Sequence, residues 1–459
     1  MKTQKNTFAS KKRNSCRFLL ATLAVATSAT LQAAVPEISG VTMAQAANRL
    51  VTIAYTLADA PAVITLDVQT NVTGDVWTSI GGAAVRNAMG DVWKRVEAGS
   101  RTITWRPDHS WPDHKIADGG ARAVVTAWAL DNTPDYMAVD VSATGGAGTQ
   151  TYYPAADFVP GGVTNAEYKT SVLLMRKIMA KDVTWTMGST PLETKREANE
   201  TAHRVTLTNN YYIGVYEVTQ AQWGLIQPSR LTPSKFNNAA DRATRPVENV
   251  SYNEIRNSAN STDDTAAYRW PADPNPNSFL GKLRTKSGLD FDLPSEAQWE
   301  FASRAGNGDT KWGDGSGILN VDSDANLNLL GRYERNGGKV WNGSSYVNPA
   351  ESCGATNGTA IVGSYAPNAW GLYDMQGNVW EWCLDWYESD ITENGGAVNI
   401  DPSAPATALS GESRSNRVLR GGSWFGAAGA CRPAQRNSNA PSTRSYSTGF
   451  RVLCSAGLR

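Results

Sequence analysis

The sequence predicts a two-domain protein: a β-sandwich followed by a larger domain of mixed helices and strands. Within residues 35–144, short β-branched segments alternate with Gly, Pro, Asn and Asp, which is typical of a sandwich. The stretch 145–164 is rich in Gly and Pro, as domain linkers often are. Residues 165–459 carry scattered helix-capping motifs and little regular periodicity, so a second domain with long irregular connections is expected there.

The first 34 residues are predicted to be a signal peptide. Lys and Arg are concentrated before Phe18, an uncharged stretch covers 18–30, and small residues near Ala33 and Ala34 suit cleavage. The apolar stretch is too short to span a bilayer, and no other segment approaches the ~20 apolar residues that a span needs. We therefore expect an exported protein without a membrane span, in the periplasm, at the cell surface or secreted.

The composition excludes several classes of function. The chain has 459 residues, 43 basic and 43 acidic side chains and a formal net charge of zero. A neutral chain without a long basic run is a poor candidate for binding nucleic acid. With only 3 His, it offers little imidazole for catalysis.

Export would also determine whether the cysteines are expected to form disulfides. An even number remains after cleavage, which favours disulfides in an oxidising compartment, with three possible connectivities. Four buried thiols are the alternative. The residues are Cys353, Cys383, Cys431 and Cys454.

The individual elements are predicted from local patterns. The sandwich strands are expected at 51–57, 62–68, 101–105 and 123–130, where β-branched residues partly alternate with polar ones. Helix starts in the second domain are expected at Thr219, Ser251 and Ser295, each of which opens a capping box. In this motif the hydroxyl accepts a hydrogen bond from the backbone three residues on, and that residue's side chain reaches back.

A Trp-rich strand is predicted near residue 380. Trp380, Trp382 and Trp386 recur with period two, which places them on one face of a strand against a core. Glu381 then points to the opposite face.

The turn before this strand is a candidate cation site. Gly377 and Asn378 permit a tight turn that would bring Asp374 back towards Glu381. Two carboxylates with free backbone carbonyls between them suit Ca²⁺. The alternative is a hydrogen-bonded turn beside a buried strand.

Eight short segments of the second domain stand out. They are WTMGS at 185–189, YEVT at 216–219, PVENVS at 246–251, LPSEAQWE at 293–300, GLYDMQGNVWEWCLDWY at 371–387, RGGSW at 420–424, CR at 431–432 and GFR at 449–451. Together these segments resemble the formylglycine-generating enzyme (sulfatase-modifying factor) family, and they occur in the family's order over roughly residues 165–455, about two thirds of the chain. The resemblance implies a C-type-lectin-like α+β fold that is poor in regular structure and stabilised by calcium.

The resemblance also implies the calcium ligands. One site would use the side chains of Asp374 and Glu381 and the carbonyls of Gly377 and Val379. A second site would involve Asn326 and the carbonyl of Leu327, although the partners expected downstream of them do not align.

The chemistry of the family's oxidases is not expected in this chain. Those oxidases hold copper through two thiolates five residues apart, and thiolates are the soft ligands that select Cu(I). Aligning the terminal Arg436 places Ala428 and Pro433 at these two positions. Copper is therefore not expected, and no catalytic residue is assigned. A related branch that holds iron through three His is excluded because the second domain has only His203.

The segment 425–448 differs most from the family in composition. It is rich in Gly, Ala, Ser and Thr between family-typical flanks, which fits either a solvated loop or a binding surface. It lines the pocket in the oxidases, and it resembles the variable region of lectin-like proteins diversified by retroelements. The predicted ligand-binding residues are Trp424, Phe425, Cys431, Arg432, Arg436 and Tyr446.

The resulting functional hypothesis is an exported, calcium-stabilised binding module for a protein, peptide or glycan ligand. One alternative is a formylglycine-generating oxidase that matures sulfatases by converting a substrate cysteine to formylglycine. A second alternative is a retroelement-diversified lectin-like variable protein.

Overall fold

The computed structural model describes residues 34–71, 76–142, 150–230, 233–258, 260, 262, 266–268, 270–350, 353–354, 356–389, 399–401 and 416–457. The predicted signal peptide lies almost wholly outside these residues. Within them, the model contains no helix that combines the length and apolar character of a membrane span.

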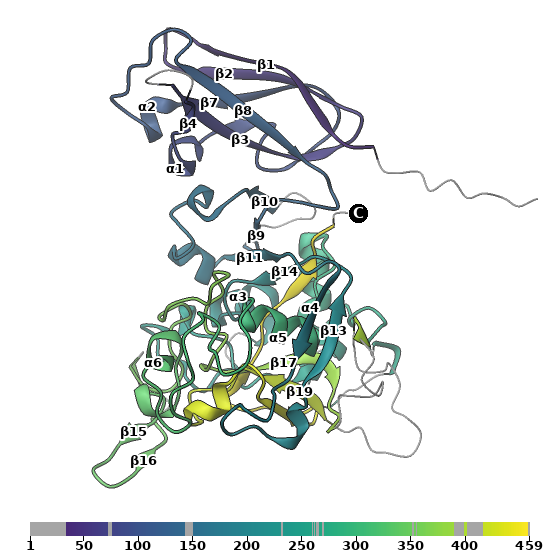
Figure 1. The fold of residues 1–459 in the computed structure, drawn as a ribbon, viewed down its shortest axis with the longest axis vertical. Coiled ribbons are helices and arrows are strands. Elements are labelled where there is room, and N and C mark those ends of the chain that lie inside the picture. Colours follow the sequence, from purple (N-terminus) through teal and green to yellow (C-terminus); the bar gives the residue numbers. More distant parts are fainter. Residues whose placement is uncertain are drawn as a thin grey trace, which may run out of the picture. The chain divides into compact units, whose positions relative to one another are not determined.

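The first domain is built from antiparallel β-sheets (Figure 1). One sheet has the order β1-β2-β7-β5, and in another β3 pairs with β4, β6 and β8. Strand β2 explains the architecture, because Val51, Ile53, Tyr55 and Leu57 are buried while the intervening residues are more exposed, the period-two pattern of a sheet packed on one face. The strands are β1 (Glu37–Gln45), β2 (Val51–Ala58), β3 (Ala62–Thr70), β4 (Thr78–Ser79), β5 (Met89–Gly90), β6 (Arg95–Val96), β7 (Gly99–Trp105) and β8 (Ala121–Trp128), with the short helices α1 (Gly82–Val85) and α2 (Pro107–Ser110).

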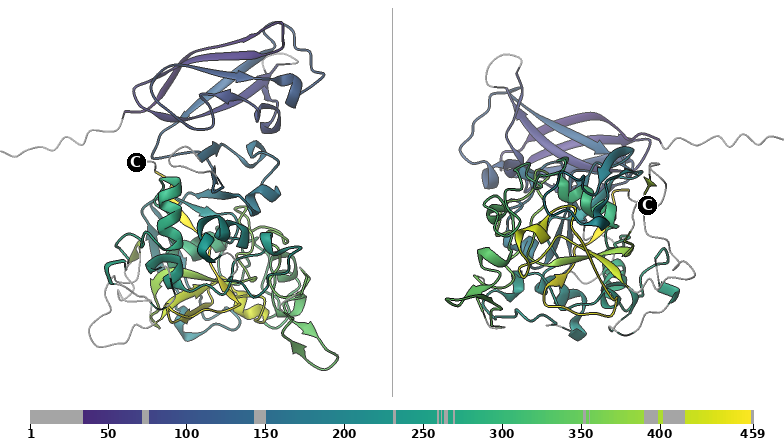
Figure 2. Two further views of the ribbon diagram at one scale, coloured as in Figure 1. Left: turned by 180° about the vertical axis from the view of Figure 1, so that it is seen from behind. Right: turned by 60° about the horizontal axis from the view of Figure 1, so that its bottom comes forward.

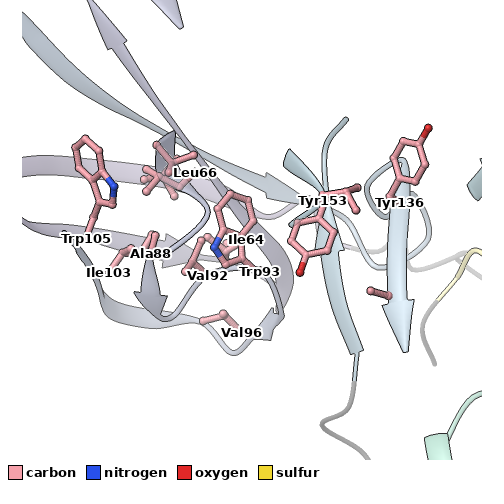
Figure 3. Close-up of a cluster of buried hydrophobic side chains, with 14 of the residues drawn as sticks. Ile64, Leu66, Ala88, Val92, Trp93, Val96, Ile103, Trp105, Tyr136 and Tyr153 are labelled. Atoms are coloured by element: carbon pink, nitrogen blue, oxygen red, sulfur yellow. The ribbon is translucent and has the colours of Figure 1, made fainter. Parts of the chain in front are cut away.

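The four segments expected to form sandwich strands correspond to β2, β3, β7 and β8, so this part of the fold prediction is confirmed. Their inward side chains share one apolar cluster (Figure 3). The same cluster includes Trp93, whose ring is 5.9 Å from that of Tyr153 and 6.1 Å from that of Phe158.

The next sheet has the strand order β10-β9-β11-β14-β22. Strand β9 lies within the range expected for the first domain, 35–144, and β10 lies within the expected linker, 145–164. The two strands pair with each other, and β9 also pairs with β11 of the second domain. Most of β9 is buried without alternation, so no period-two signal marked it in the sequence. The strands are β9 (Tyr136–Asp140), β10 (Gln150–Tyr153), β11 (Val172–Ile178), β14 (Tyr211–Gly214) and β22 (Leu453–Ser455).

Capping boxes open two of the longer helices, as predicted. Thr219 begins α3 (Gln220–Ile226) and Ser295 begins α5 (Glu296–Arg304), each with both reciprocal hydrogen bonds in place. At Ser251 the same reciprocal bonds form with Glu254, but they precede a single π-helical turn, Asn253–Asn257 (η6). Helix α4 (Phe279–Ser287) is capped by Ser278 and ends at Gly288, which has a positive φ.

The Trp-rich strand is β17 (Trp380–Trp386), which lies in a sheet of order β20-β19-β17-β21. Its residues from Glu381 onward are all buried. Both faces of the strand are therefore covered, and Glu381 points into protein. Its sheet partners are β19 (Arg417–Arg420), β20 (Arg436–Asn439) and β21 (Thr448–Gly449).

The other elements are short and joined by long connections (Figures 1 and 2). A further sheet has the order β12-β13-β18, and β15 pairs with β16 in a hairpin. The bounds are β12 (Val183–Met187), β13 (His203–Leu207), β15 (Val340–Trp341), β16 (Tyr346–Val347), β18 (Asn399–Ile400), α6 (Leu327–Leu330), η1 (Ala156–Phe158), η2 (Ala166–Lys169), η3 (Ala198–Glu200), η4 (Pro228–Arg230), η5 (Arg242–Thr244), η7 (Ala266–Tyr268), η8 (Glu334–Asn336) and η9 (Ala428–Cys431).

The disulfide prediction is wrong for the described cysteines. Cys353, Cys383, Cys431 and Cys454 are all free thiols. The physical reason is their placement: Cys454, Cys383 and Cys431 belong to three different apolar clusters. The alternative of buried thiols fits these three, while Cys353 is partly exposed.

Buried arginines connect the loops of the second domain. Arg451 is fully buried and donates hydrogen bonds to both oxygens of Glu381, at 2.7–2.9 Å, and to the carbonyls of Gly214 and Tyr373. A planar guanidinium suits this role because its five N–H groups can satisfy a carboxylate and loop carbonyls together. One side chain thereby joins β14, β17 and the turn before β17.

Replacing Arg451 with Met should lower the free energy of unfolding by about 3–5 kcal/mol, because the buried Glu381 carboxylate would lose its counter-charge. The double variant R451M/E381Q should recover part of this loss, because no unpaired charge then remains. Urea denaturation of the two variants and the wild type measures both effects. A single variant as stable as the wild type would contradict the role given to this ion pair.

Candidate functional site

The turn before β17 requires residues that tolerate a positive φ. Asp374, Gly377 and Asn378 have φ of 56°, 100° and 62°. At Gly377 a Cβ would lie 2.3 Å from the Arg332 carbonyl oxygen, so a side chain is excluded there. The Gly377 N–H donates to the Gly421 carbonyl and the Asn378 N–H to the Arg332 carbonyl, each at 2.7 Å.

Asp374 is buried beneath this turn with one oxygen unsatisfied. Its Oδ2 accepts a hydrogen bond from the Gly363 N–H at 2.6 Å, whereas Oδ1 is buried and has no hydrogen-bond partner among the described residues. Burial raises the pKa of this carboxyl to about 6, against the opposing effects of the Gly363 N–H and Arg451. A buried carboxylate oxygen without a donor is a position that a bound cation would satisfy.

Glu381 is satisfied within the protein. Besides the two-pronged pair with Arg451, it accepts a hydrogen bond from the Trp299 indole N–H at 2.7 Å. Of the two carboxylates predicted to hold calcium, Glu381 is thus already neutralised by a cation of the chain. The predicted carbonyl positions, Gly377 and Val379, lie on the turn between the two carboxylates.

Glu217 also belongs to the cluster at the turn before β17, although it was not predicted from the sequence. It is fully buried and accepts hydrogen bonds from the Asn378 amide at 2.6 Å and from the Val379 N–H at 3.2 Å. Burial raises its pKa well above the usual range, and the charges of Asp374 and Glu381 raise it further. The only sequence signal was its place in the YEVT segment, which carries no local sign of cation binding.

The residues around this turn fit a cation only in part. Arg451 interacts electrostatically with Glu381, Glu217 and Asp374, and Lys169 and Arg332 also interact with Asp374. The unsatisfied Asp374 oxygen fits calcium, while the Arg451 pair occupies Glu381. Among the described residues, no group of three or more His, Cys, Asp or Glu side chains is arranged to hold a metal ion.

At the second predicted calcium site, Asn326 and Leu327 make local hydrogen bonds within the chain. The Leu327 carbonyl accepts a hydrogen bond from the Gly331 N–H at 3.1 Å, and the Asn326 amide donates to the Gly317 carbonyl at 2.8 Å. The neighbouring Asp324 accepts hydrogen bonds from the backbone N–H groups of residues 319, 320, 326 and 327. All these groups serve the local fold around α6.

The structure separates the predicted ligand-binding residues into two groups. Cys431, Arg432 and Arg436 form the buried group. Arg432 pairs with Glu193 and Glu200, and Arg436 pairs with Glu296. In these positions their guanidinium groups hold loops together and do not face solvent.

The second group is aromatic and reaches the surface. Trp424 is fully buried, donates its indole N–H to the Tyr446 carbonyl at 3.0 Å, and lies edge-on to Phe236 at 5.0 Å. Phe425 packs edge-on against Trp424 at 5.5 Å and is 40% exposed. Phe236 was not predicted from the sequence, because it lies far from the C-terminal segment along the chain.

Glu248 is buried next to Phe236 of this aromatic group. Its Oε1 accepts a hydrogen bond from the Phe236 N–H at 2.8 Å, and its Oε2 is buried without a hydrogen-bond partner in the described part of the chain. Burial raises the pKa of Glu248 to about 8, although backbone N–H donors and the charges of Lys235 and Arg245 oppose the shift.

Comparison with known families and proteins decides where the chain belongs. Residues 174–456 match the model of the sulfatase-modifying factor enzyme 1-like domain, which is more than half of the chain. The chain belongs to the sulfatase-modifying factor enzyme family. This confirms the resemblance seen in its motifs.

Curated relatives of this sulfatase-modifying factor domain include formylglycine-generating enzymes. The enzyme of Thermomonospora curvata is 32% identical over 244 residues, which cover 51% of this chain and 64% of that protein. The enzyme of Streptomyces coelicolor is 35% identical over 223 residues, covering 47% and 55%. The chain therefore spans less than two thirds of these relatives. A shorter match, 34% over 159 residues, is to a Chlamydia pneumoniae protein named serine/threonine-protein kinase pkn1, covering 35% and 20%.

Two solved structures are similar to the sulfatase-modifying factor domain. Treponema denticola variable protein 1 matches with a TM-score of 0.44 and 27% identity, covering 62% of this chain and 95% of that one. PvdO from Pseudomonas aeruginosa matches with a TM-score of 0.43 and 23% identity, covering 62% and 94%.

The raised pKa of Glu248 predicts a pH dependence of stability. A carboxyl whose pKa is higher in the folded state stabilises the fold below its unfolded pKa, and this contribution is lost as the pH rises through about 8. Glu248→Gln keeps the shape and removes the titration. We expect E248Q to gain stability relative to the wild type between pH 5 and pH 8, by a few kcal/mol, in urea denaturation series.

The exposed Glu197 supplies the control. E197Q should change stability little and with no comparable pH trend. If the difference between E248Q and the wild type were constant across this pH range, the folded protein would not hold Glu248 protonated.

Proposed function

We propose that this domain is a ligand-binding module of the sulfatase-modifying factor family and not one of its copper oxidases. The observation that carries the proposal is the exposed Phe425, which packs on the buried Trp424, a ring that also contacts Tyr446. This aromatic group belongs to the segment that the family resemblance places at the ligand pocket.

The base under Phe425 is rigid. The Trp424 backbone N–H donates to the Asn378 carbonyl at 2.8 Å, and its ring is fixed by Phe236 and by the indole hydrogen bond. Rings held in place before binding lose little conformational entropy on contact with a ligand, which favours aromatic side chains at binding surfaces. The structural support for Phe425 therefore suits molecular recognition.

The thiols near this segment support a role without copper. The family resemblance would place Ala428 and Pro433 at the positions of the two copper ligands, and neither has a side chain that binds metal. Burial raises the pKa of Cys431 to about 12, so its thiolate, the form that binds Cu(I), is strongly disfavoured.

The proposal also covers where the protein acts, what stabilises it and which ligands it binds. The protein would act outside the cytoplasm, stabilised by calcium at Asp374, and would bind a protein, peptide or glycan. The alternative is formylglycine generation on sulfatase substrates, the activity for which the relatives at 32% and 35% identity are named.

A peptide display library and a glycan array provide the test of binding. The wild type should enrich ligands that F425A/Y446A loses by tenfold or more, since truncating aromatic anchors at a binding surface costs on the order of 2 kcal/mol or more. F158A, which removes an aromatic ring that packs against Trp93 outside this segment, should retain them. Ligands held equally by F425A/Y446A would contradict the proposed surface.

The oxidase alternative has its own readout. Copper-loaded protein is incubated with a sulfatase-motif cysteine peptide and oxygen, and aldehyde is followed by mass spectrometry. We expect no aldehyde, and its oxygen-dependent formation would overturn the non-oxidase assignment.

Calcium should raise the melting temperature, and chelation should lower it by about 5–10 °C if the site is near saturation. The physical reason is that the cation satisfies the buried Asp374 oxygen and offsets the surplus of carboxylates. D374A should remove this response, whereas D324A, which breaks the turn near α6, should lower stability but keep it. An unchanged calcium response in D374A would exclude this residue as a ligand.

A further inference from the structure

Three cations lie over aromatic rings on the surface around Phe425. The Lys339 ammonium is 4.1 Å from the ring centre of Phe425, and the Lys235 ammonium is 4.3 Å from that of Tyr446. The Arg335 guanidinium is 4.3 Å from the ring centre of Tyr346. We name this set the cationic strip; it comprises Lys235, Arg335, Lys339, Tyr346, Phe425 and Tyr446.

Contacts between its segments join the cationic strip into one surface. Trp424 touches both Phe425 and Tyr446, with ring centres 5.5 Å and 5.9 Å apart. The Glu334 N–H donates to the Gly426 carbonyl at 2.9 Å. The Glu334 carboxylate lies 2.9 Å from Lys339 and 3.3 Å from Arg335. The segments around residues 235, 335–346 and 425–446 therefore meet here.

The strip has a surplus of positive charge although the chain as a whole is neutral. Glu334 is the carboxylate that pairs with its cations in the described residues, which leaves a net positive surface. Beside it lies the β15–β16 hairpin (Figure 1). In this hairpin Trp341 is 56% exposed, and its ring lies 5.0 Å from that of Tyr346. The surface therefore combines the cationic hydrogen-bond donors of the strip with the exposed ring of Trp341.

The geometry favours an acidic peptide over a sugar. A pyranose stacks on an open ring face, but cations lie over the rings of Phe425, Tyr446 and Tyr346. Ammonium and guanidinium groups still have N–H donors to offer, and these form charge-assisted hydrogen bonds with carboxylates. Exposed Trp341 can at the same time pack against apolar side chains of a peptide.

We propose that the cationic strip binds an acidic segment of a partner protein. Asp or Glu carboxylates of the segment accept hydrogen bonds from Lys235, Arg335 and Lys339, while apolar residues of the segment pack on Trp341. This inference rests on the proposed function, because it names the ligand chemistry of the same surface.

The test uses fluorescence anisotropy of a short fluorescein-labelled peptide of Glu, Phe and Gly with the full chain. The same peptide with Lys in place of Glu is the second probe, and labelled polygalacturonate is the third. We expect the acidic peptide to bind in preference to both others. Raising salt should weaken binding, because exposed charges are screened beyond a Debye length of about 10 Å at 0.1 M.

Variants then assign the binding to the strip. K235Q/R335Q/K339Q should weaken binding of the acidic peptide by about tenfold, since exposed charge pairs are individually weak. K115Q/K181Q/R204Q removes the same charges from exposed positions elsewhere and should leave affinity unchanged. Because Arg335 and Lys339 both pair with Glu334, K235Q serves as a second variant that keeps both pairs intact and should still weaken binding.

Other outcomes overturn the inference in distinguishable ways. Equal affinity in the site and control variants would place the binding elsewhere, and a preference for polygalacturonate would assign the strip to an acidic glycan. If library ligands that depend on Phe425 and Tyr446 are not acidic, the proposed function stands and this inference fails. If no ligand depends on those two rings, both fail.

Discussion

The second domain depends on guanidinium groups buried among its loops. Arg451, Arg432 and Arg436 each pair with a buried carboxylate and also donate to loop carbonyls. A domain with few long helices and strands leaves many backbone carbonyls without partners from regular structure, and buried polar groups must be satisfied. Arginine meets this need because it carries several donors in a fixed plane, and each buried cation then requires a carboxylate.

This constraint explains the character of the two candidate sites. At the turn before β17, Arg451 pairs with Glu381, whereas Asp374 keeps one buried oxygen without a hydrogen-bond partner among the described residues and Glu217 has a strongly raised pKa. In the C-terminal segment, the buried Arg432 and Arg436 are engaged in internal ion pairs, so the proposed binding surface uses aromatic rings and the more exposed cations near them. Arginine thereby stabilises the interior at Arg432 and Arg436, whereas Arg335 lies exposed at the surface.

Local patterns predicted the elements whose signal is local. The alternation in β2 and the capping boxes at Thr219 and Ser295 each depend on residues a few positions apart, and the structure contains them. Strand β9 escaped prediction because it is buried without alternation. The disulfide expectation failed because pairing depends on distance in space, and three of the thiols lie in separate clusters.

The sequence by itself determined the family, the order of its motifs and the left-handed turn at Gly377 and Asn378, because these depend on residue identity and close neighbours. Only the tertiary structure decided the state of Glu381, whose partner Arg451 lies 70 residues away along the chain. It also brought Glu217 to Asp374 and Phe236 beneath Trp424. Contacts between distant segments leave no periodic trace, since they are fixed by packing and by the pairing of buried charge.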